Sequence, residues 1–386
     1  MSWRILPRTV WFLGALSLLN DAASELVYPL VPLYLSSVLL AGPRTLGLIE
    51  GAAEATASLL KLFAGAWSDR SGTAKPWVLG GYGAAAIARP LIALVASWPA
   101  LLVLRLLDRA GKGLRTAPRD AMLARAVQPG QRGLAFGFHR AMDNAGAVIG
   151  PVAGALALRA GLPIQDVLLW TLVPGLACVA LAASLPEVPL EIGRRVVTDW
   201  RWQALPVTFR RYLGALALFT LANSSNMFLL LRAKALGLPA YQVPLAWGAV
   251  ALVAALLSVP MSAWSDRLPR QRLIVAGWGL YGLLYLALGL LPPAPILVWI
   301  WFLLYGVFLA ATEGAEKALV ADLVPPAQLG SAYGWFNLIA GLLLLPASYL
   351  FGQLWEHVSP LAAFAASAGF AGAAAVRLHL VLRTPA

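Results

Sequence analysis

Two pairs of acidic residues lie within apolar segments of this chain. Asp21 and Glu25 stand four residues apart, and Glu50 and Glu54 repeat that spacing in the next apolar segment, so each pair shares one face of a helix. A charge at the centre of a lipid bilayer costs roughly 2.5–3.5 kcal/mol, so such side chains have to face a cavity or a partner. A carboxyl group in an apolar cavity tends to keep its proton, and a nearby arginine favours its release. We therefore predict that Asp21, Glu25 or Glu54 takes up a proton and releases it again.

The same acids could instead be permanently paired with basic residues and only hold helices together. Basic side chains that could pair with them lie within the apolar segments at Arg105, Arg109, Arg115 and Arg140. The sequence leaves both interpretations open.

A basic run between residues 109 and 120 also has two interpretations. Guanidinium and ammonium groups could present positive charge to an anionic substrate, or they could anchor the end of a helix at the membrane interface as part of a gate. We favour the gate for Arg115, Arg119 and Asp120, and we keep Arg109 and Lys112 as candidates for the substrate cavity. A second charged cluster at the equivalent depth of the other half fits a paired gate, and it comprises Glu313, Glu316 and Lys317.

Further polar residues inside apolar segments are candidates for substrate contacts. They are Arg140, Asp143, Asn223, Asn226 and Asn337. The alternative is that these side chains form hydrogen bonds between helices.

The composition identifies a membrane protein. Hydrophobic residues make up 60% of the chain and charged residues only 12%, and the mean hydropathy is +0.76, so a water-soluble domain is excluded. A single cysteine, Cys178, excludes an intrachain disulfide, and three scattered histidines argue against a histidine-rich metal site, so we expect neither a metal nor a cofactor. The net charge of +12 would suggest nucleic acid in a soluble protein, but its distribution here does not.

Apolar runs of about 20 residues predict an all-α membrane protein with twelve transmembrane helices. We expect them near residues 11–38, 45–68, 76–97, 100–118, 133–158, 164–185, 209–236, 241–264, 271–292, 295–317, 330–355 and 358–380. Basic residues concentrate in the loops on one side, so the positive-inside rule puts both termini in the cytoplasm.

The chain contains an internal repeat, so its two halves are predicted to share one fold. The pentapeptide Ala66-Trp67-Ser68-Asp69-Arg70 recurs as Ala263-Trp264-Ser265-Asp266-Arg267, 197 residues later. We predict an N-terminal six-helix bundle over 1–185, a cytoplasmic linker over 186–211 and a C-terminal six-helix bundle over 212–386. Because six is even, the bundles are parallel repeats.

Three motifs resemble those of the major facilitator superfamily. Gly65-x-x-x-Asp69-Arg70-x-Gly72 resembles its signature after helix two, and Arg105-Leu106-Leu107-Asp108 resembles the start of its helix-four motif. Gly146-x-x-x-Gly150-Pro151-x-x-Gly154 resembles the helix-five motif of its proton-coupled exporters. Glycines four residues apart also let a helix lie close to its neighbour, and proline kinks it.

The resemblance implies roles for these residues. It adds Arg105 and Asp108 to the candidates for proton coupling. Because the two copies of the pentapeptide end apolar runs at equivalent places, we predict two cytoplasmic gate loops, which contain Gly65, Asp69, Arg70, Asp266 and Arg267. The alternative is that these charges only anchor the loops at the membrane interface.

We therefore expect a secondary transporter and not an enzyme, exporting a small organic molecule against protons by alternating access, with the substrate held between the two halves. No Gly-x-x-x-x-Gly-Lys-Ser/Thr loop occurs, which argues against direct use of ATP. The alternative substrate is an organic anion, taken up or exported. From other classes, a membrane sensor or a membrane-embedded enzyme stays possible. We expect a monomer in the plasma (inner) membrane whose partners are lipid, protons and substrate, and no nucleic acid.

Overall fold

A computed structural model describes residues 6–71, 73–128, 131–186, 201–265, 269–325 and 328–381, and the regular elements in these ranges are helices. The first half contains α1 (Arg8–Ser37), α2 (Pro43–Ser71), α3 (Lys75–Leu91), the short 3₁₀ helix η2 (Ile92–Leu94), α4 (Trp98–Arg125), α5 (Arg132–Arg159), α6 (Ile164–Leu169) and α7 (Leu172–Ala183). The second half contains η4 (Trp202–Ala204), α8 (Val207–Ala222), α9 (Met227–Ala235), α10 (Gln242–Ser265), α11 (Arg270–Leu290), α12 (Pro295–Leu323), α13 (Leu329–His357) and α14 (Pro360–Val381). The predicted all-α fold of two repeated six-helix halves is confirmed.

Helices of membrane-spanning length account for most of the chain. Within the described ranges, nine helical segments are long and apolar enough to cross a bilayer. Charged residues lower the mean hydropathy of α4, whose sequence holds Arg105, Asp108, Arg109, Lys112 and Arg115. A helix of this kind needs partners or a cavity for its charges, and the site described below provides several such partners.

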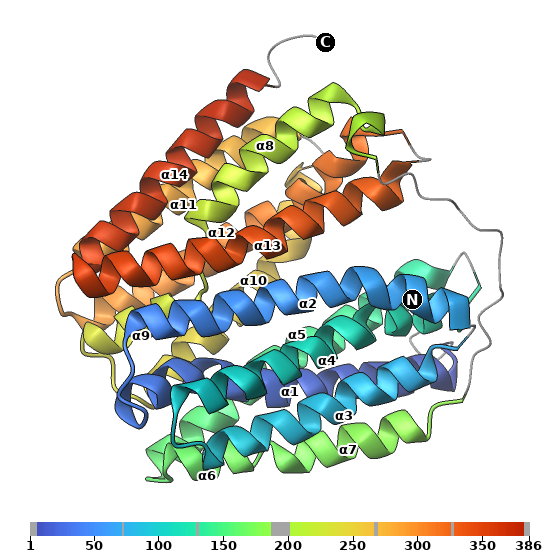
Figure 1. The fold of residues 1–386 in the computed structure, drawn as a ribbon, viewed down its shortest axis with the longest axis horizontal. Coiled ribbons are helices and arrows are strands. Elements are labelled where there is room, and N and C mark those ends of the chain that lie inside the picture. The colour runs from blue at the N-terminus through green and yellow to red at the C-terminus, as the bar shows by residue number, and fades with distance from the viewer. Residues whose placement is uncertain are drawn as a thin grey trace. The chain divides into compact units, whose positions relative to one another are not determined.

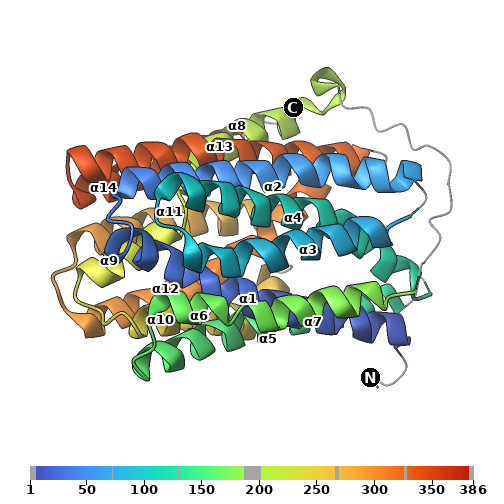
Figure 2. The same ribbon diagram turned by 60° about the horizontal axis from the view of Figure 1, so that its bottom comes forward.

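Two of the predicted spans are interrupted. The span predicted over 164–185 is divided into α6 and α7 at Trp170 and Thr171, which Figure 2 shows as two successive green helices. The span predicted over 209–236 is divided into α8 and α9 by Asn223–Asn226. Asparagine and serine side chains compete for backbone hydrogen bonds, which explains why the second helix breaks there. Each pair of helices still forms one candidate membrane span, Ile164–Ala183 and Val207–Ala235, so the two predicted spans are confirmed and each contains a break.

The chain forms two compact units. The first comprises residues 1–40, 56–194 and 240–248, and the second comprises 41–55, 195–239 and 249–386. The opening turns of α2 therefore belong to the second unit, and the opening turns of α10 belong to the first.

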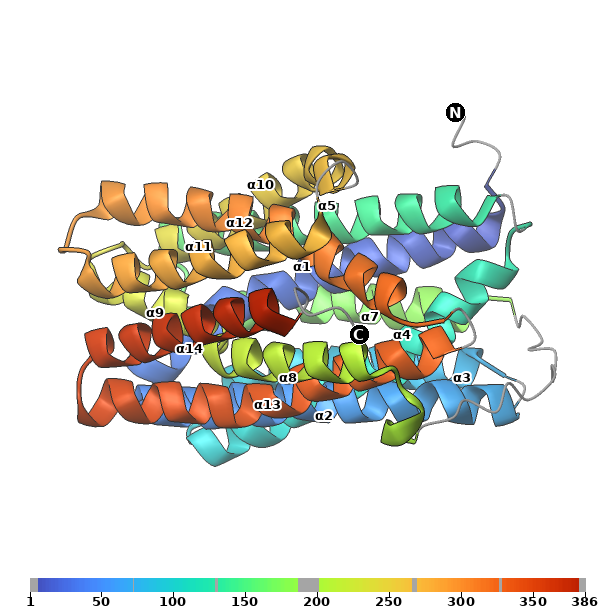
Figure 3. The ribbon, with the colours of Figure 1, turned by 90° about the horizontal axis from the view of Figure 1, so that it is seen from above.

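The two units repeat one pattern of helix contacts. In the first unit α1 packs against α5 and α7, and α3 packs against α4 and α7; Figure 1 shows α3 beside α7. In the second unit α8 packs against α13 and α14, and α11 packs against α12 and α14; Figure 3 shows α14 alongside α8 and α13. These pairs correspond one to one when the first helix of each half is matched, which is the repeat that the sequence predicts.

Candidate functional site

The acid-bearing helix α1 rests directly on the glycines of α5. A Cβ atom added to Gly146 would lie 2.5 Å from the carbonyl oxygen of Leu18 and 3.0 Å from Cβ of Asp21. One turn later, a Cβ on Gly150 would collide with the carbonyl oxygen of Ala22. The two helices run parallel and in register, and only glycine lets them approach so closely.

Asp143 of α5 faces α1 through two polar contacts. The hydroxyl of Ser17 donates a hydrogen bond to Oδ1 of Asp143, and Nδ1 of His139 lies 3.5 Å from Oδ2. Ser17 is fully buried and His139 is 4% exposed. Asp143, a candidate for the substrate cavity, is therefore positioned by a neighbouring helix as well as by its own.

The candidate proton carriers Asp21 and Glu25 are brought together on one face of α1, as expected. The side-chain amide of Asn20 donates a 2.9 Å hydrogen bond to Oδ1 of Asp21. The indole nitrogen of Trp247 donates a 2.8 Å hydrogen bond to Oε2 of Glu25, and the Trp247 ring stacks on Tyr28 with centroids 5.2 Å apart. Trp247 lies in the opening turns of α10, within the first unit. Its role was not predicted, because a tryptophan in an apolar helix normally signals packing.

A buried charge cluster joins α3 and α4. Nε of Arg89 donates to Oδ1 of Asp108 over 2.9 Å, and Nη1 of Arg105 lies 3.4 Å from Oδ2 of the same carboxylate. These three side chains are at most 5% exposed. Nη1 of Arg89 also donates to the carbonyl oxygen of Asn20 over 3.0 Å, so the cluster reaches the backbone beside Asp21.

Close packing of glycines supports this cluster. A Cβ on Gly81 of α3 would lie 2.6 Å from the carbonyl oxygen of Gly111 of α4, and the two helices lie side by side (Figure 2).

Arg89 was missed by the sequence predictions. Its signal was an arginine near the end of an apolar span, to which the cost of a buried charge applies.

The gate candidates of α4 have local partners. Arg115 is buried, donates to the carbonyl oxygen of Gly81 over 3.3 Å and lies over the Tyr82 ring. Arg119 donates to Oδ1 of the adjacent Asp120 from Nε and from Nη2.

Among the substrate-cavity candidates, Arg109 is buried, whereas Lys112 and Arg140 are exposed within long helices. A charged residue exposed at such a place in a membrane helix has to face a polar environment.

In the second unit, several side chains support the break between α8 and α9. Tyr305 donates from its hydroxyl to Oδ1 of Asn226 over 2.7 Å, and Tyr281 donates to the carbonyl oxygen of Ala222 over 3.0 Å. The hydroxyl of Ser348 accepts a 3.0 Å hydrogen bond from the backbone nitrogen of Ser225. The break is thus held by α11, α12 and α13.

The other two substrate-contact candidates of this unit, Asn223 and Asn337, form hydrogen bonds to nearby backbone carbonyl groups. Asn223 caps α8 with its backbone nitrogen. Asn337 donates to the carbonyl oxygen of Tyr333 within its own helix.

One gate candidate of the second unit also has a clear partner. Glu316 accepts a 2.7 Å hydrogen bond from the indole nitrogen of Trp278, whose ring stacks on Phe219. Arg270, which was not predicted to pair, donates to both carboxylate oxygens of Asp322 over 2.7 Å and joins the start of α11 to the end of α12.

The remaining gate candidates stay predictions. Asp266 and Arg267 lie outside the described residues, and only the helical backbone is described at Gly65, Asp69, Arg70, Glu313 and Lys317. The proton-coupling candidate Glu54 also stays a prediction, and it lies in the part of α2 that belongs to the second unit.

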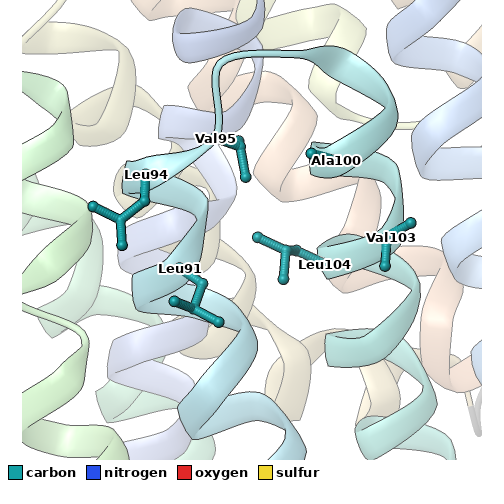
Figure 4. Close-up of a pocket in the computed structure, with 6 residues that line it drawn as sticks. All are labelled: Leu91, Leu94, Val95, Ala100, Val103 and Leu104. Atoms are coloured by element: carbon teal, nitrogen blue, oxygen red, sulfur yellow. The ribbon is translucent and has the colours of Figure 1, made fainter.

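A groove of about 440 Å³ opens on the first unit between the end of α3 and the start of α4. Its lining is entirely apolar and comprises Leu91, Leu94, Val95, Ala100, Val103 and Leu104, as Figure 4 shows. These side chains offer no group for proton transfer or for recognition of charge. Among the described residues, no group of three or more histidine, cysteine and acidic side chains is arranged to hold a metal ion.

Comparisons with known proteins agree with this architecture. The sequence pattern of the Major Facilitator Superfamily matches residues 11–199 and 212–386. An uncharacterised MFS-type transporter of Methanocaldococcus jannaschii is 31% identical over 364 residues, which cover 92% of this chain and 90% of that protein. The multidrug resistance protein MdtH of Photorhabdus laumondii is 28% identical over 345 residues, covering 86% of this chain and 82% of its own.

A crystal structure of a mutant of the nucleoside transporter NupG superposes with a TM-score of 0.83 at 14% identity, covering 97% of this chain and 99% of that chain. At this level of identity the likeness shows the fold alone. Fold, helix content and family pattern together establish an integral membrane transporter rather than an enzyme. The chain belongs to the major facilitator superfamily.

Proposed function

We propose that this transporter exports a small organic molecule in exchange for protons, and that Asp21 and Glu25 carry the protons. The observation that carries the proposal is the close contact of α1, at Asp21 and Ala22, with Gly146 and Gly150 of α5. These are the glycines of the motif that resembles the exporters of the family. The relatives named as multidrug resistance proteins also support export.

Each carrier has a hydrogen-bond donor that can stabilise its charged form. Asn20 donates to Asp21, and Trp247 donates to Glu25. A conformational change that withdraws either donor would favour the protonated acid, and its return would favour release. Asp108 differs because two buried arginines contact its carboxylate. We assign Asp108 and Arg105 to a permanent ion pair that supports the carriers.

Proteoliposomes test the proposal with ethidium as an organic cation and carboxyfluorescein as an organic anion. A pH gradient should drive accumulation of ethidium by the wild type, and Asp21→Asn combined with Glu25→Gln should abolish the effect of the gradient. Asp166→Asn is the control, because Asp166 is an exposed acid in α6. Ethidium transport that ignores the gradient in the wild type would refute proton coupling.

A second candidate is an organic anion, favoured by the exposed cations Lys112 and Arg140. Transport of carboxyfluorescein but not of ethidium would support this candidate. Lys112→Gln should then raise the concentration of carboxyfluorescein needed for half-maximal transport, because an ammonium group no longer attracts the anion.

We further propose a monomer in the inner membrane with both termini in the cytoplasm. The excess of basic residues on one side of the predicted layout supports this orientation. Cysteine accessibility tests it when a cysteine is placed near each terminus in a Cys178→Ser background.

A further inference from the structure

We infer that His139 and Asp143 form a proton relay that delivers protons along the α1–α5 interface to Asp21. The inference rests on the proposed function, in which Asp21 is a proton carrier. It assigns a role to His139, which is not among the predicted site residues, and it gives Asp143 a role other than substrate contact.

The imidazole of His139 has one nitrogen engaged and one available. Nδ1 lies 3.5 Å from Oδ2 of Asp143. Nε2 is buried and has no hydrogen-bond partner among the described residues. A buried imidazole nitrogen without a protein partner is a place where water binds. The two nitrogens therefore face different neighbours, as a relay requires.

The next group on the path is held in place by α1. Asp143 accepts the hydrogen bond of Ser17, and Ser17 stands four residues before Asp21, which is one helical turn. At about 1.5 Å per residue, His139 lies roughly 10 Å from the start of α5, and Asp21 lies roughly 20 Å from the start of α1. Because the helices are parallel, His139, Asp143 and Asp21 lie at successive depths.

The surrounding charges determine how the proton moves. His139 is under the electrostatic influence of Arg119 and Asp120 from α4, Asp21 from α1 and Arg140 on its own helix. Asp21 is influenced by Asp143 from α5 and by Lys112, Arg115 and Arg119 from α4. Because His139 is buried, a long-lived charged imidazolium is disfavoured. Transfer through His139 is therefore concerted.

In that transfer, Nε2 gains a proton from a hydronium ion, which becomes water, while Nδ1 gives its own proton to Oδ2 of Asp143. The imidazole stays neutral and changes tautomer, and the carboxylate of Asp143 becomes a neutral acid. Asp143 then passes the proton to the carboxylate of Asp21 and regains its negative charge. The imidazole returns to its first tautomer when Nε2 releases its proton to water and Nδ1 takes one from water. The net change is the transfer of one proton from a hydronium ion to Asp21, so atoms and charges balance.

Nuclear magnetic resonance tests the relay without any substrate. The chain has only three histidines, so His357→Gln with His379→Gln leaves His139 as the single imidazole. With ¹⁵N-labelled histidine in lipid bilayers, we expect exchange of the imidazole protons with water and a change of tautomer or hydrogen bonding in Asp143→Asn. An imidazole that does not exchange with water, or whose signals do not change in Asp143→Asn, would overturn the inference.

Transport gives a second test. In His139→Gln, ethidium export driven by a pH gradient should fall about tenfold, whereas exchange of ethidium without a gradient should stay at the wild-type rate. In His139→Ala, added imidazole should restore part of the gradient-driven rate, which a purely structural defect would not allow.

The relay and the proposed function are refuted by different outcomes. If the wild type exports ethidium with the gradient and His139→Gln does so equally well, the relay is refuted and the proposed function stands. If the wild type itself ignores the gradient, the proposed function fails, and the relay that depends on it fails as well.

Discussion

Arg89 and Asp108 form a buried ion pair, with Nε of the arginine 2.9 Å from Oδ1 of the aspartate. The side chains of Arg89 and Asp108 are 5% and 2% exposed. Removing one partner of a buried pair leaves an uncompensated charge, which typically costs about 3–5 kcal/mol. We therefore expect Asp108→Asn and Arg89→Gln to lower the free energy of unfolding by that amount, measured by equilibrium unfolding in mixed micelles.

The pair between Arg270 and Asp322 is the matched control. It has a shorter distance, 2.7 Å, but its side chains are 28% and 52% exposed. An exposed pair contributes about 0–1 kcal/mol, so Arg270→Gln should change stability little. Equal losses at the two pairs would show that burial does not set the strength of the Arg89–Asp108 contact.

The hydrogen bond from Trp247 to Glu25 is expected to affect proton coupling. Trp247→Phe removes the N–H donor but keeps an aromatic ring to stack on Tyr28. A hydrogen bond to a charged group is worth about 1.5–3 kcal/mol, so the pH profile of ethidium export should shift while exchange without a gradient continues.

Two further variants separate this effect from packing. Trp170→Phe changes an exposed tryptophan of the same unit and should leave the pH profile unchanged. When Glu25→Gln is already present, Trp247→Phe should add no further shift, since the pair has already been removed. An additive shift would mean that Trp247 acts on another group.

Two glycines of α5, Gly150 and Gly154, are expected to tolerate alanine to different degrees. Gly150→Ala places a Cβ against the backbone of Ala22, whereas Gly154→Ala finds its nearest neighbour, Cγ of Leu26, at 3.6 Å. Overpacking costs about 1–3 kcal/mol, so Gly150→Ala should lower thermal stability and transport, and Gly154→Ala should be tolerated. Thermal unfolding in detergent and ethidium export measure both effects. Similar behaviour of the two variants would refute the close contact at Gly150.

The break between α8 and α9 depends on Ser348. Its hydroxyl accepts the hydrogen bond of the buried backbone nitrogen of Ser225. Ser348→Ala leaves that nitrogen without its partner, and we expect a loss of about 1–3 kcal/mol. Thermal unfolding measures it, with Ser184→Ala as control because Ser184 is exposed and bonds only within its own helix. A loss of the same size in the control would argue against a special role for Ser348.

Much of the fold follows from the sequence because lipid imposes strong constraints. Apolar length and the repeated pentapeptide suffice to predict helical spans in two halves. The interruption at Asn223–Asn226 was not predicted, although four consecutive polar residues were its signal. Whether such residues break a helix depends on partners such as Ser348 and Tyr305, which lie far along the chain.

The candidate site was predictable only in part, because several of its contacts also join residues that are far apart along the chain. The spacing of Asp21 and Glu25 put both acids on one helix face, as the structure has them. Spacing could not show that Asp108 pairs with Arg89, because that contact joins two helices. It also could not identify Trp247 as the donor to Glu25, since the two residues are 222 positions apart.

The close contact of α1 with α5 limits how this transporter can move. With Gly146 and Gly150 seated against the backbone of α1, neither helix can slide or roll past the other without steric overlap. Ser17, Asp21, His139 and Asp143 must therefore travel together as one rigid body in any change of state. We therefore propose that access of water to that body changes during the transport cycle.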